Sequence, residues 1–315
     1  MKPEREYRAT IRINMDGIPG RLQVRLQWYI NMVAFGLQAS EHFESAQLVL
    51  PNARMTIRLS GDSAAWNVTE IRKAFANWVV ACGLRELIEE FSGALEESRQ
   101  ILAVWALGSG EIRAEDWNEK IVAEAKRFHR LGLPDKLAFL QTQYQVALPP
   151  DKEKDLISLN RARNCLVHRE GIISLQDLPV TKEQFDNALM DRRRRFPDEK
   201  WTNQQIIDAL KDAGLQPSLE VTWPRFELFT EKDGVESIID PRARTPVEGG
   251  SMLSLRMVKE RAEFEFGSVI RLSADAVSDI GYALLNTAFA LRDAVEARGR
   301  ALGANFEGGA DSGAG

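Results

Sequence analysis

The sequence predicts a mainly α-helical protein, in which a bundle of long helices is interrupted by a mixed α/β insertion and preceded by a short mixed region. Two observations support this prediction. Apolar residues recur at helical spacing over 63–175 and again over 273–302, as they do where one face of a helix is buried. Over 176–272 this spacing gives way to two short helices and then to strands, in which apolar and polar residues alternate.

These patterns divide the 315 residues into five segments. A chain of this length suggests one elaborated domain or two small ones. The glycine-rich C-terminus is expected to be flexible. The segments are an N-terminal mixed α/β region (1–62), a helical bundle (63–175), a mixed α/β insertion (176–272), a closing helix of the bundle (273–302) and a flexible tail (303–315).

The first segment contains two stretches, 7–13 and 53–61, that alternate apolar and polar residues. Such alternation is typical of half-buried strands. Between them, the sequence RLQVRLQWYINMVAFGLQ (21–38) fits either an amphipathic helix or a strand that leads into a helix. The residues alone leave both alternatives open.

Three helices are predicted at the start of the bundle segment. The first covers 66–107, and Gly83 within it marks a kink or a break. The second and third cover 114–131 and 135–146. Gly132 and Pro134 separate these two, because neither residue continues a helix well.

Two helices and three strands are predicted in the insertion. The helices are TKEQFDNALMDRRRRF (181–196) and TNQQIIDALKDAG (202–214). Thr202 or Asn203 is a good N-cap for the second helix. The strands are LEVTWPRFELFT (219–230), GVESIID (234–240) and RAEFEFGSVIRL (261–272). The closing helix of the bundle is predicted over 274–299.

The composition is that of an ordinary globular protein, with 44% hydrophobic and 28% charged residues. Its formal net charge of −5 argues against non-specific coating of nucleic acid, although a local basic site stays compatible with it. Cys82 and Cys165 are far apart, so we expect no disulfide framework and a reducing, cytoplasmic location. The N-terminus shows no secretory signal, and no apolar run is long enough to predict a membrane span.

No metal and no cofactor are expected from the sequence. His42 and His129 have no Cys, Asp or Glu at a spacing that would make a convincing metal site. The motifs of phosphate-binding loops, dinucleotide-binding folds and serine hydrolases are missing from any strand–turn–helix context.

A further helix, predicted over 152–168, carries an apolar stripe of Leu156, Leu159 and Leu166 that can face a core. Gly171 just beyond it is a suitable C-terminal stop. The rest of the helix is rich in polar groups, which is why it is the first place to look for a functional site.

The polar groups of this helix fall on a face different from the apolar stripe. Asn160, Asn164 and His168 are spaced four apart and share one face. Arg161 projects within roughly 20° of His168, whereas Arg163 lies to the other side of the asparagines. The helix therefore offers amides, guanidinium groups and an imidazole on one surface.

These groups suffice, in principle, to cut RNA without a metal. The pKa of histidine, about 6.5 when unperturbed, suits proton transfer near neutrality. Arginine binds phosphate with a forked geometry and can neutralise the charge that builds on the phosphorane. One histidine cannot easily act as both acid and base, so a two-fold dimer would have to provide the second. The alternative to a catalytic site is an ordinary solvated helix face, on which His168 suits the negative end of the helix dipole.

The sequence RNCLVH, from Arg163 to His168, resembles the signature of the HEPN superfamily. That signature is an arginine, four to six further residues and then a histidine, often with a polar residue directly after the arginine. Arg163 fits the four-residue spacing, and Asn164 fills the polar position. Arg161 fits the six-residue spacing and remains the alternative arginine. The resemblance covers about 66–175 together with 268–299.

Membership of this superfamily would imply an HEPN-like helical bundle that dimerises. Many members are metal-independent endoribonucleases of toxin, antiphage-defence and RNA-processing systems. The resemblance thus implies an RNA substrate, a homodimer, products with 2′,3′-cyclic phosphate ends, and an antitoxin or defence-system protein as a possible partner. Arg163, Asn164 and His168 would be the catalytic residues.

Other members have lost activity and serve as modules for dimerisation or partner binding, and this is the alternative function here. One subgroup carries a tyrosine two residues after the histidine, which a partner nucleotidyltransferase modifies. This chain has Glu170 at that position, which puts such control in doubt.

Two further charged groups bear on the prediction. Arg192, Arg193, Arg194 and Arg195 form a run that could contact an RNA backbone, although such a run more often forms a solvated face. The long helix predicted over 66–107 carries four glutamates, any of which could support His168 from a neighbouring helix. These are Glu89, Glu90, Glu96 and Glu97.

Overall fold

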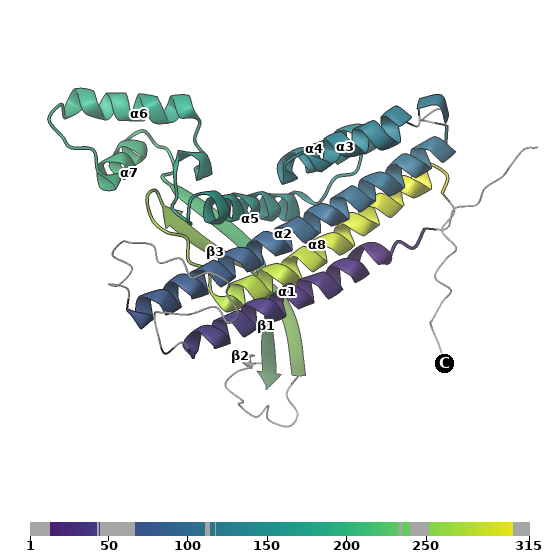
Figure 1. Cartoon of the computed structure of the whole chain (residues 1–315), viewed down its shortest axis with the longest axis horizontal. Coiled ribbons are helices and arrows are strands. Elements are labelled where there is room, and N and C mark those ends of the chain that lie inside the picture. Colours follow the sequence, from purple (N-terminus) through teal and green to yellow (C-terminus); the bar gives the residue numbers. More distant parts are fainter. Residues whose placement is uncertain are drawn as a thin grey trace, which may run out of the picture. The chain divides into compact units, whose positions relative to one another are not determined.

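The structure is a computed structural model of the whole chain, and it describes residues 13–42, 44, 67–110, 114–116, 118–232, 235–239 and 252–304. Over these residues the protein is mainly helical, with eight α-helices and one three-stranded antiparallel sheet (Figure 1). The predicted mainly α class is therefore confirmed. Apart from residue 13, the strands predicted at 7–13 and 53–61 lie outside the described residues.

The helices are α1 (Gly17–Glu41), α2 (Val68–Gly108), α3 (Glu124–His129), α4 (Leu133–Tyr144), α5 (Pro150–His168), α6 (Lys182–Arg195), α7 (Asn203–Asp212) and α8 (Ala274–Ala301). The stretch 21–38, which fitted two alternatives, is helical throughout. The helices predicted at 66–107, 135–146 and 274–299 are confirmed as α2, α4 and α8, with ends shifted by no more than two residues.

Two helices of the insertion begin with reciprocal caps. The Thr181 hydroxyl accepts a hydrogen bond from the Gln184 N–H at 3.2 Å, and the Thr202 hydroxyl accepts one from the Gln205 N–H at 3.4 Å. In each case the glutamine side chain accepts the N–H of the threonine in return. Thr202 is therefore the N-cap of α7, and Asn203 is its first helical residue.

The single helix predicted over 114–131 is wrong. This stretch contains a 3₁₀ turn (Ala114–Asp116), a π-helical turn (Asn118–Ala123) and the short helix α3. The carboxylate of Glu124, which is buried at the start of α3, accepts a hydrogen bond from the Tyr144 hydroxyl at 2.8 Å. A π turn adds one residue to a helical turn and so rotates the residues after it about the axis. We attribute the interruption to the need to aim this carboxylate inward, which apolar periodicity does not report.

The chain divides into two compact units. Unit 1 comprises Met1–Val24, Phe91–Pro149 and Thr287–Gly315, and unit 2 comprises Arg25–Glu90 and Pro150–Asn286. Each of the long helices α1, α2 and α8 therefore contributes one part to unit 1 and the other part to unit 2.

Unit 1 has an apolar core that also encloses charged groups. Its largest buried apolar side chains are Ile18, Phe91, Leu95, Leu102, Phe128 and Leu140. Lys136 is 3% exposed, and its ammonium group donates hydrogen bonds to Ser92 Oγ at 2.7 Å and Glu96 Oε1 at 2.6 Å. A buried ammonium group needs such partners, because burial removes its water.

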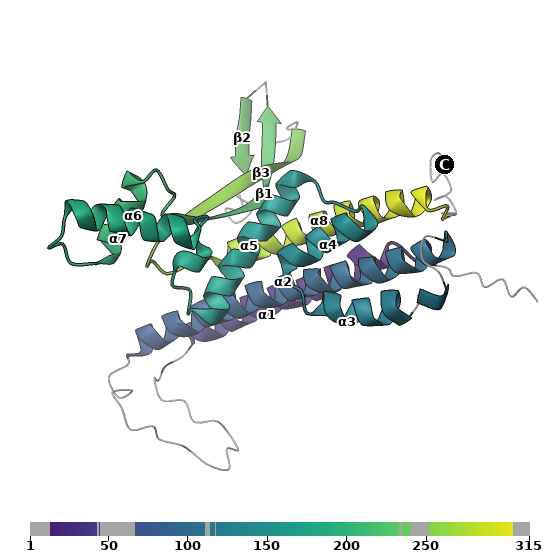
Figure 2. The ribbon, with the colours of Figure 1, turned by 90° about the horizontal axis from the view of Figure 1, so that it is seen from above.

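In unit 2, α1, α2 and α8 lie side by side (Figures 1 and 2). The break predicted at Gly83 does not occur, because α2 continues through it. A Cβ atom added at Gly83 would lie 2.3 Å from Val33 Cγ2, and one added at Gly36 would lie 3.0 Å from two carbons of Val79. These glycines therefore allow close packing of α1 against α2.

The sheet belongs to unit 2 and has the strand order β2-β1-β3. Its antiparallel strands are β1 (Ser218–Lys232), β2 (Val235–Ile239) and β3 (Met252–Glu265). The strand predicted over 261–272 overlaps only the end of β3. Beyond Glu265 the chain turns at Gly267, whose φ of +75° favours glycine. Val269 then forms an isolated bridge with Ile172.

We predict that Gly83→Ala destabilises the protein, because its new methyl group would collide with Val33. Overpacking of this kind typically costs about 1–3 kcal/mol. Gly93→Ala is the matched control, since Gly93 lies in the same helix and has no atom within 4 Å of the added Cβ. Alanine there should stabilise by roughly 0.5–1 kcal/mol. Urea unfolding of both variants measures the difference, and equal effects would contradict the packing.

Candidate functional site

Helix α5 is held against strand β1 of unit 2 by hydrogen bonds near its middle. The buried Thr222 N–H donates to Ser158 Oγ at 3.1 Å, and the Thr222 hydroxyl donates to Asp155. The ammonium group of Lys259 on β3 lies 2.8 Å from the same Asp155 carboxylate. These bonds fix which face of α5 meets the sheet.

The C-terminal end of α5 agrees with the prediction. The helix ends at His168, and Gly171 has a φ of +80°. The N–H groups of Arg169 and Gly171 both donate to the Cys165 carbonyl, at 3.0 and 3.1 Å. The positive φ of Gly171 turns the chain away from the helix axis, so His168 occupies its last turn.

An ion pair with a buried carboxylate holds the chain just beyond the helix. The guanidinium group of Arg169 pairs with Asp177, which is 1% exposed and also accepts the Ser174 N–H at 2.9 Å. Cys165 is buried nearby, and its burial, followed by the charge of Asp177, raises the pKa of its thiol to about 12. Cys165 is therefore a packing residue of α5 and not a reactive thiol.

Arg163, the arginine preferred from the sequence, lies within a small polar cluster. Its guanidinium group donates to the Asn164 side-chain oxygen at 2.9 Å and pairs with the carboxylate of Glu89 on α2. The Arg163 side chain is only 18% exposed, and its Nε is buried without a hydrogen-bond partner among the described residues. Glu89, one of the glutamates considered as support for His168, thus pairs with the arginine instead.

His168 and Arg161 are exposed to solvent. Asn164 lies one turn before His168 on the same helix face, and Arg161 lies two turns before it, about 10 Å along the axis. Arg163 projects about 140° away from His168 around the helix. The structure thus joins Arg163 to Asn164 directly, whereas Arg161 and His168 share a face.

A pocket with a volume of about 410 Å³ opens beside the same helix. We call it the α5–β1 pocket. Its lining includes Lys154, Ile157, Arg161, Pro179, Gln216 and Leu219. The polar face of α5 therefore runs from this pocket to His168.

The arginine run at the end of α6 is largely engaged within unit 2. Arg192 bonds to the Glu199 carboxylate at 2.7 and 2.8 Å, and it lies 3.5–3.6 Å from Asp208 and Asp212 of α7. The Arg195 guanidinium lies 3.6 Å from Asp212 as well. This arrangement uses the run to join α6 to α7.

The remaining two arginines of the run face solvent. Arg194 lies 3.4 Å from Asp191, and Arg193 is exposed. Arg193 is therefore the member of the run that has no ion pair among the described residues.

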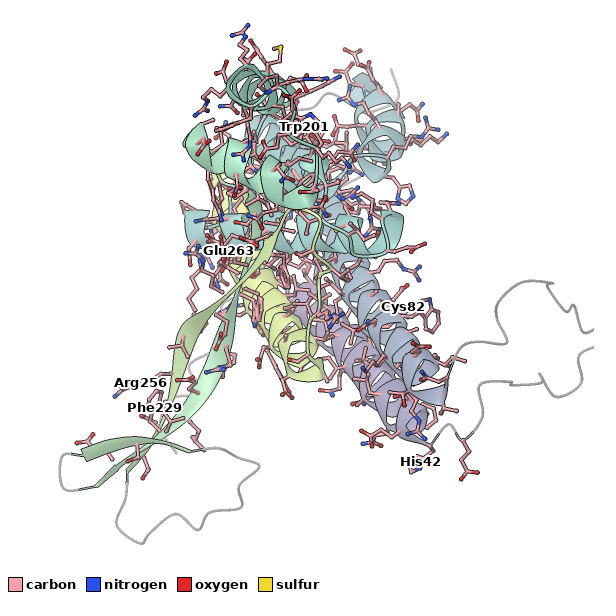
Figure 3. All side chains as sticks on the ribbon, turned by 90° about the vertical axis from the view of Figure 1, so that its left-hand side faces the viewer. His42, Cys82, Trp201, Phe229, Arg256 and Glu263 are labelled. Atoms are coloured by element: carbon pink, nitrogen blue, oxygen red, sulfur yellow. The ribbon has the colours of Figure 1, made fainter. Side chains whose placement is uncertain are left out.

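The other two histidines do not join the cluster on α5. His129 Nδ1 lies 2.9 Å from Glu96 in unit 1, and His42 lies at the end of α1 in unit 2 (Figure 3). Within the described ranges no group of three or more His, Cys, Asp and Glu side chains is placed to hold a metal ion. Over the same part of the chain, no helix has the length and apolar character needed to cross a membrane.

Comparisons with family models, curated proteins and solved structures find no match to this chain. The resemblance to HEPN proteins therefore rests on the residues of α5 and their surroundings. Two partners of this region could not be assigned from the sequence. Asp177 stands in a capping-box pattern with Ser174, but its ion pair with Arg169 left no sequence signal. Glu89 was one of four candidate glutamates, and it is 74 positions away from the arginine it binds.

We predict that the Cys165 thiol resists alkylation by iodoacetamide at pH 8 in the folded protein. Its pKa, raised from 9.0 to about 12, leaves almost no thiolate at that pH. A Cys82→Ala background removes the other thiol, and mass spectrometry follows the label. The folded state binds the Cys165 thiol proton more tightly than the unfolded state does, so the protonated thiol favours folding. This contribution to stability is complete below pH 9 and is lost between pH 9 and pH 12. Rapid native labelling at pH 8 would contradict the burial of this helix face.

Proposed function

We propose that this protein is a metal-independent endoribonuclease of the HEPN type that acts as a homodimer. The observation that carries the proposal is the cluster on α5, where Arg163 is bonded to Asn164 and His168 stands exposed one turn further on. This places a guanidinium group, an amide and an accessible imidazole at the end of one helix. These groups can supply the proton transfer and the charge stabilisation that phosphoester cleavage without a metal requires.

In the proposed reaction, His168 takes the proton from the ribose 2′-hydroxyl. The resulting 2′-oxygen attacks the adjacent phosphate, the 5′-oxygen leaves, and a 2′,3′-cyclic phosphate remains. His168 of the second subunit protonates the leaving oxygen, which gives each histidine one role. Arg163 stabilises the added charge on the phosphate, and Asn164 orients the phosphate or the imidazole.

The choice between the two arginines is sharpened by their environments. Arg163 is positioned by Glu89 and Asn164, as a catalytic group must be, but Glu89 also neutralises its charge. Arg161 is exposed and lies on the His168 side of the helix. A phosphate that binds Arg163 would therefore compete with Glu89 for the guanidinium group. Among the residues that the structure describes, no carboxylate pairs with Arg161, so a phosphate would meet no such competition there.

The same ion pair favours the second candidate function, an inactive HEPN-like module for dimerisation or partner binding. In such a module Arg163 would serve to join α5 to α2 through Glu89, and His168 would have no catalytic role. The role of a toxin or antiphage-defence effector, acting in the cytoplasm and held by a protein partner, comes from the resemblance and belongs to the first candidate.

We predict that His168→Ala lowers RNA cleavage at least about a hundredfold, because a positioned general base typically contributes 10²–10⁴-fold. Arg163→Ala should cause a similar loss. His42→Ala is the matched control, since it removes an exposed histidine outside the cluster and should leave the rate unchanged. Cleavage of a labelled RNA is measured in gels, and the ends are assigned by mass spectrometry.

The same assay decides between the arginines and tests the metal independence. A loss in Arg161→Ala that Arg163→Ala does not share would transfer the catalytic role to Arg161. Activity should persist in EDTA, because side chains supply the base and the charge stabilisation. Cleavage that stops in EDTA and returns with magnesium would overturn the mechanism.

We predict a homodimer in solution, with α5 near the two-fold axis, because two copies of His168 must share one cleft. Light scattering at micromolar protein should give about twice the chain mass of 35.4 kDa. Mixing wild-type chains with an excess of His168→Ala chains should then suppress activity, because each mixed dimer lacks one of the two histidines that the cleft uses. A monomer that cleaves RNA would contradict the shared cleft.

A further inference from the structure

The α5–β1 pocket contains groups that the proposed cleavage reaction does not use. Lys154 and Arg161 lie in its lining, and both side chains are exposed. Among the described residues, neither cation is engaged in a hydrogen bond or an ion pair. Two cations that project from one side of a helix beside a pocket repel each other, and an anion between them removes this repulsion.

Two carboxylates also lie in the lining. Glu220 lies 3.1 Å from the Arg261 guanidinium, which pairs with Glu263 at 3.4 Å as well. Glu153 is the other carboxylate. The lining charges therefore cancel in sum, but Lys154 and Arg161 project from the same side of α5, where a single anion can meet both.

The remaining lining is apolar, with one amide. Ile157 and Pro179 provide accessible apolar surface, and the buried Leu219 adds to the wall. The Gln216 amide nitrogen donates to Ser218 Oγ at 3.4 Å, which leaves its oxygen free to accept a hydrogen bond from a ligand. Apolar walls with a few placed polar groups are typical of small-ligand sites, and the volume lies in their usual range of about 300–1,000 Å³.

We propose that the α5–β1 pocket binds one unpaired nucleotide of an RNA strand. Its base lies against Ile157 and Pro179 and presents its edge to Gln216, while its phosphate lies between Lys154 and Arg161. Proteins read single-stranded RNA in this way, by holding a splayed base against a surface and bonding to its edge. This inference rests on the proposed function, because it assigns the pocket to the same substrate.

The position of the pocket defines its role in cleavage. Arg161 lies about 10 Å along the helix axis from His168. The bound nucleotide is therefore a neighbour of the one that is cut, and the pocket sets which sequence is presented to His168. Arg161 accordingly binds substrate, and Arg163 remains the arginine at the scissile phosphate.

The test uses the full chain with His168→Ala, so that the RNA stays intact. Fluorescence anisotropy measures the affinity for a labelled single-stranded RNA of mixed sequence at physiological salt. Adding Arg161→Ala or Ile157→Trp, which fills the pocket, should weaken binding about tenfold or more. Arg130→Ala is the matched control, since it removes an exposed arginine that belongs to unit 1 and should change affinity less than about twofold.

If circular dichroism shows that the Ile157→Trp variant is unfolded, the RNA affinity of Arg161→Ala alone tests the proposal. Unchanged affinity in the variants that fold, an equal loss in Arg130→Ala, or no binding by His168→Ala would overturn the proposal.

The outcomes for the pocket and for the proposed function can be told apart. A wild-type protein that cleaves RNA while the pocket variants bind and cut as before would keep the function and discard the pocket. A wild-type protein that cuts no RNA, together with weakened binding in the pocket variants, would keep the pocket and discard the nuclease.

Discussion

The hydrogen bonds between α5 and strand β1 fix the helix on which both the motif and the pocket lie. Ser158 and Thr222 are buried, so each needs a partner within the protein. They satisfy one another, and Asp155 accepts the Thr222 hydroxyl. Sliding or rotating α5 would leave these groups buried and unpaired, which costs about 1–3 kcal/mol for each group. This anchor therefore sets which residues of α5 face the pocket.

The ion pair between Glu89 and Arg163 has two opposite consequences for catalysis by the motif. A carboxylate beside the guanidinium keeps it in one orientation, which favours catalysis by removing the need to order it later. The same carboxylate must be displaced, or share the guanidinium, when a phosphate arrives. A pair that is partly exposed, as this one is, is weakened by water and salt, so such sharing requires little energy.

Most of the helices could be predicted from the sequence, because their apolar residues recur over several turns. The stretch after residue 114 could not, since a buried carboxylate, Glu124, and not an apolar stripe, sets its geometry. For the motif, the spacing from Arg163 to His168 located the helix and its end. The partner Glu89 and the wall that β1 adds to the pocket come from residues distant in the sequence. Local patterns contain no record of such pairings, so only the folded chain reveals them.

The strand order β2-β1-β3 leaves β3 at the edge of the sheet, paired on one side with β1 over the described residues. An unpaired edge of this length can template the addition of a strand from another molecule. The second half of β3 is dense in charge, with Lys259, Glu260, Arg261, Glu263 and Glu265. An incoming strand would have to strip water from these side chains, which discourages aggregation through the edge. The protein can thus keep a long open strand edge without presenting an uncharged template to another strand.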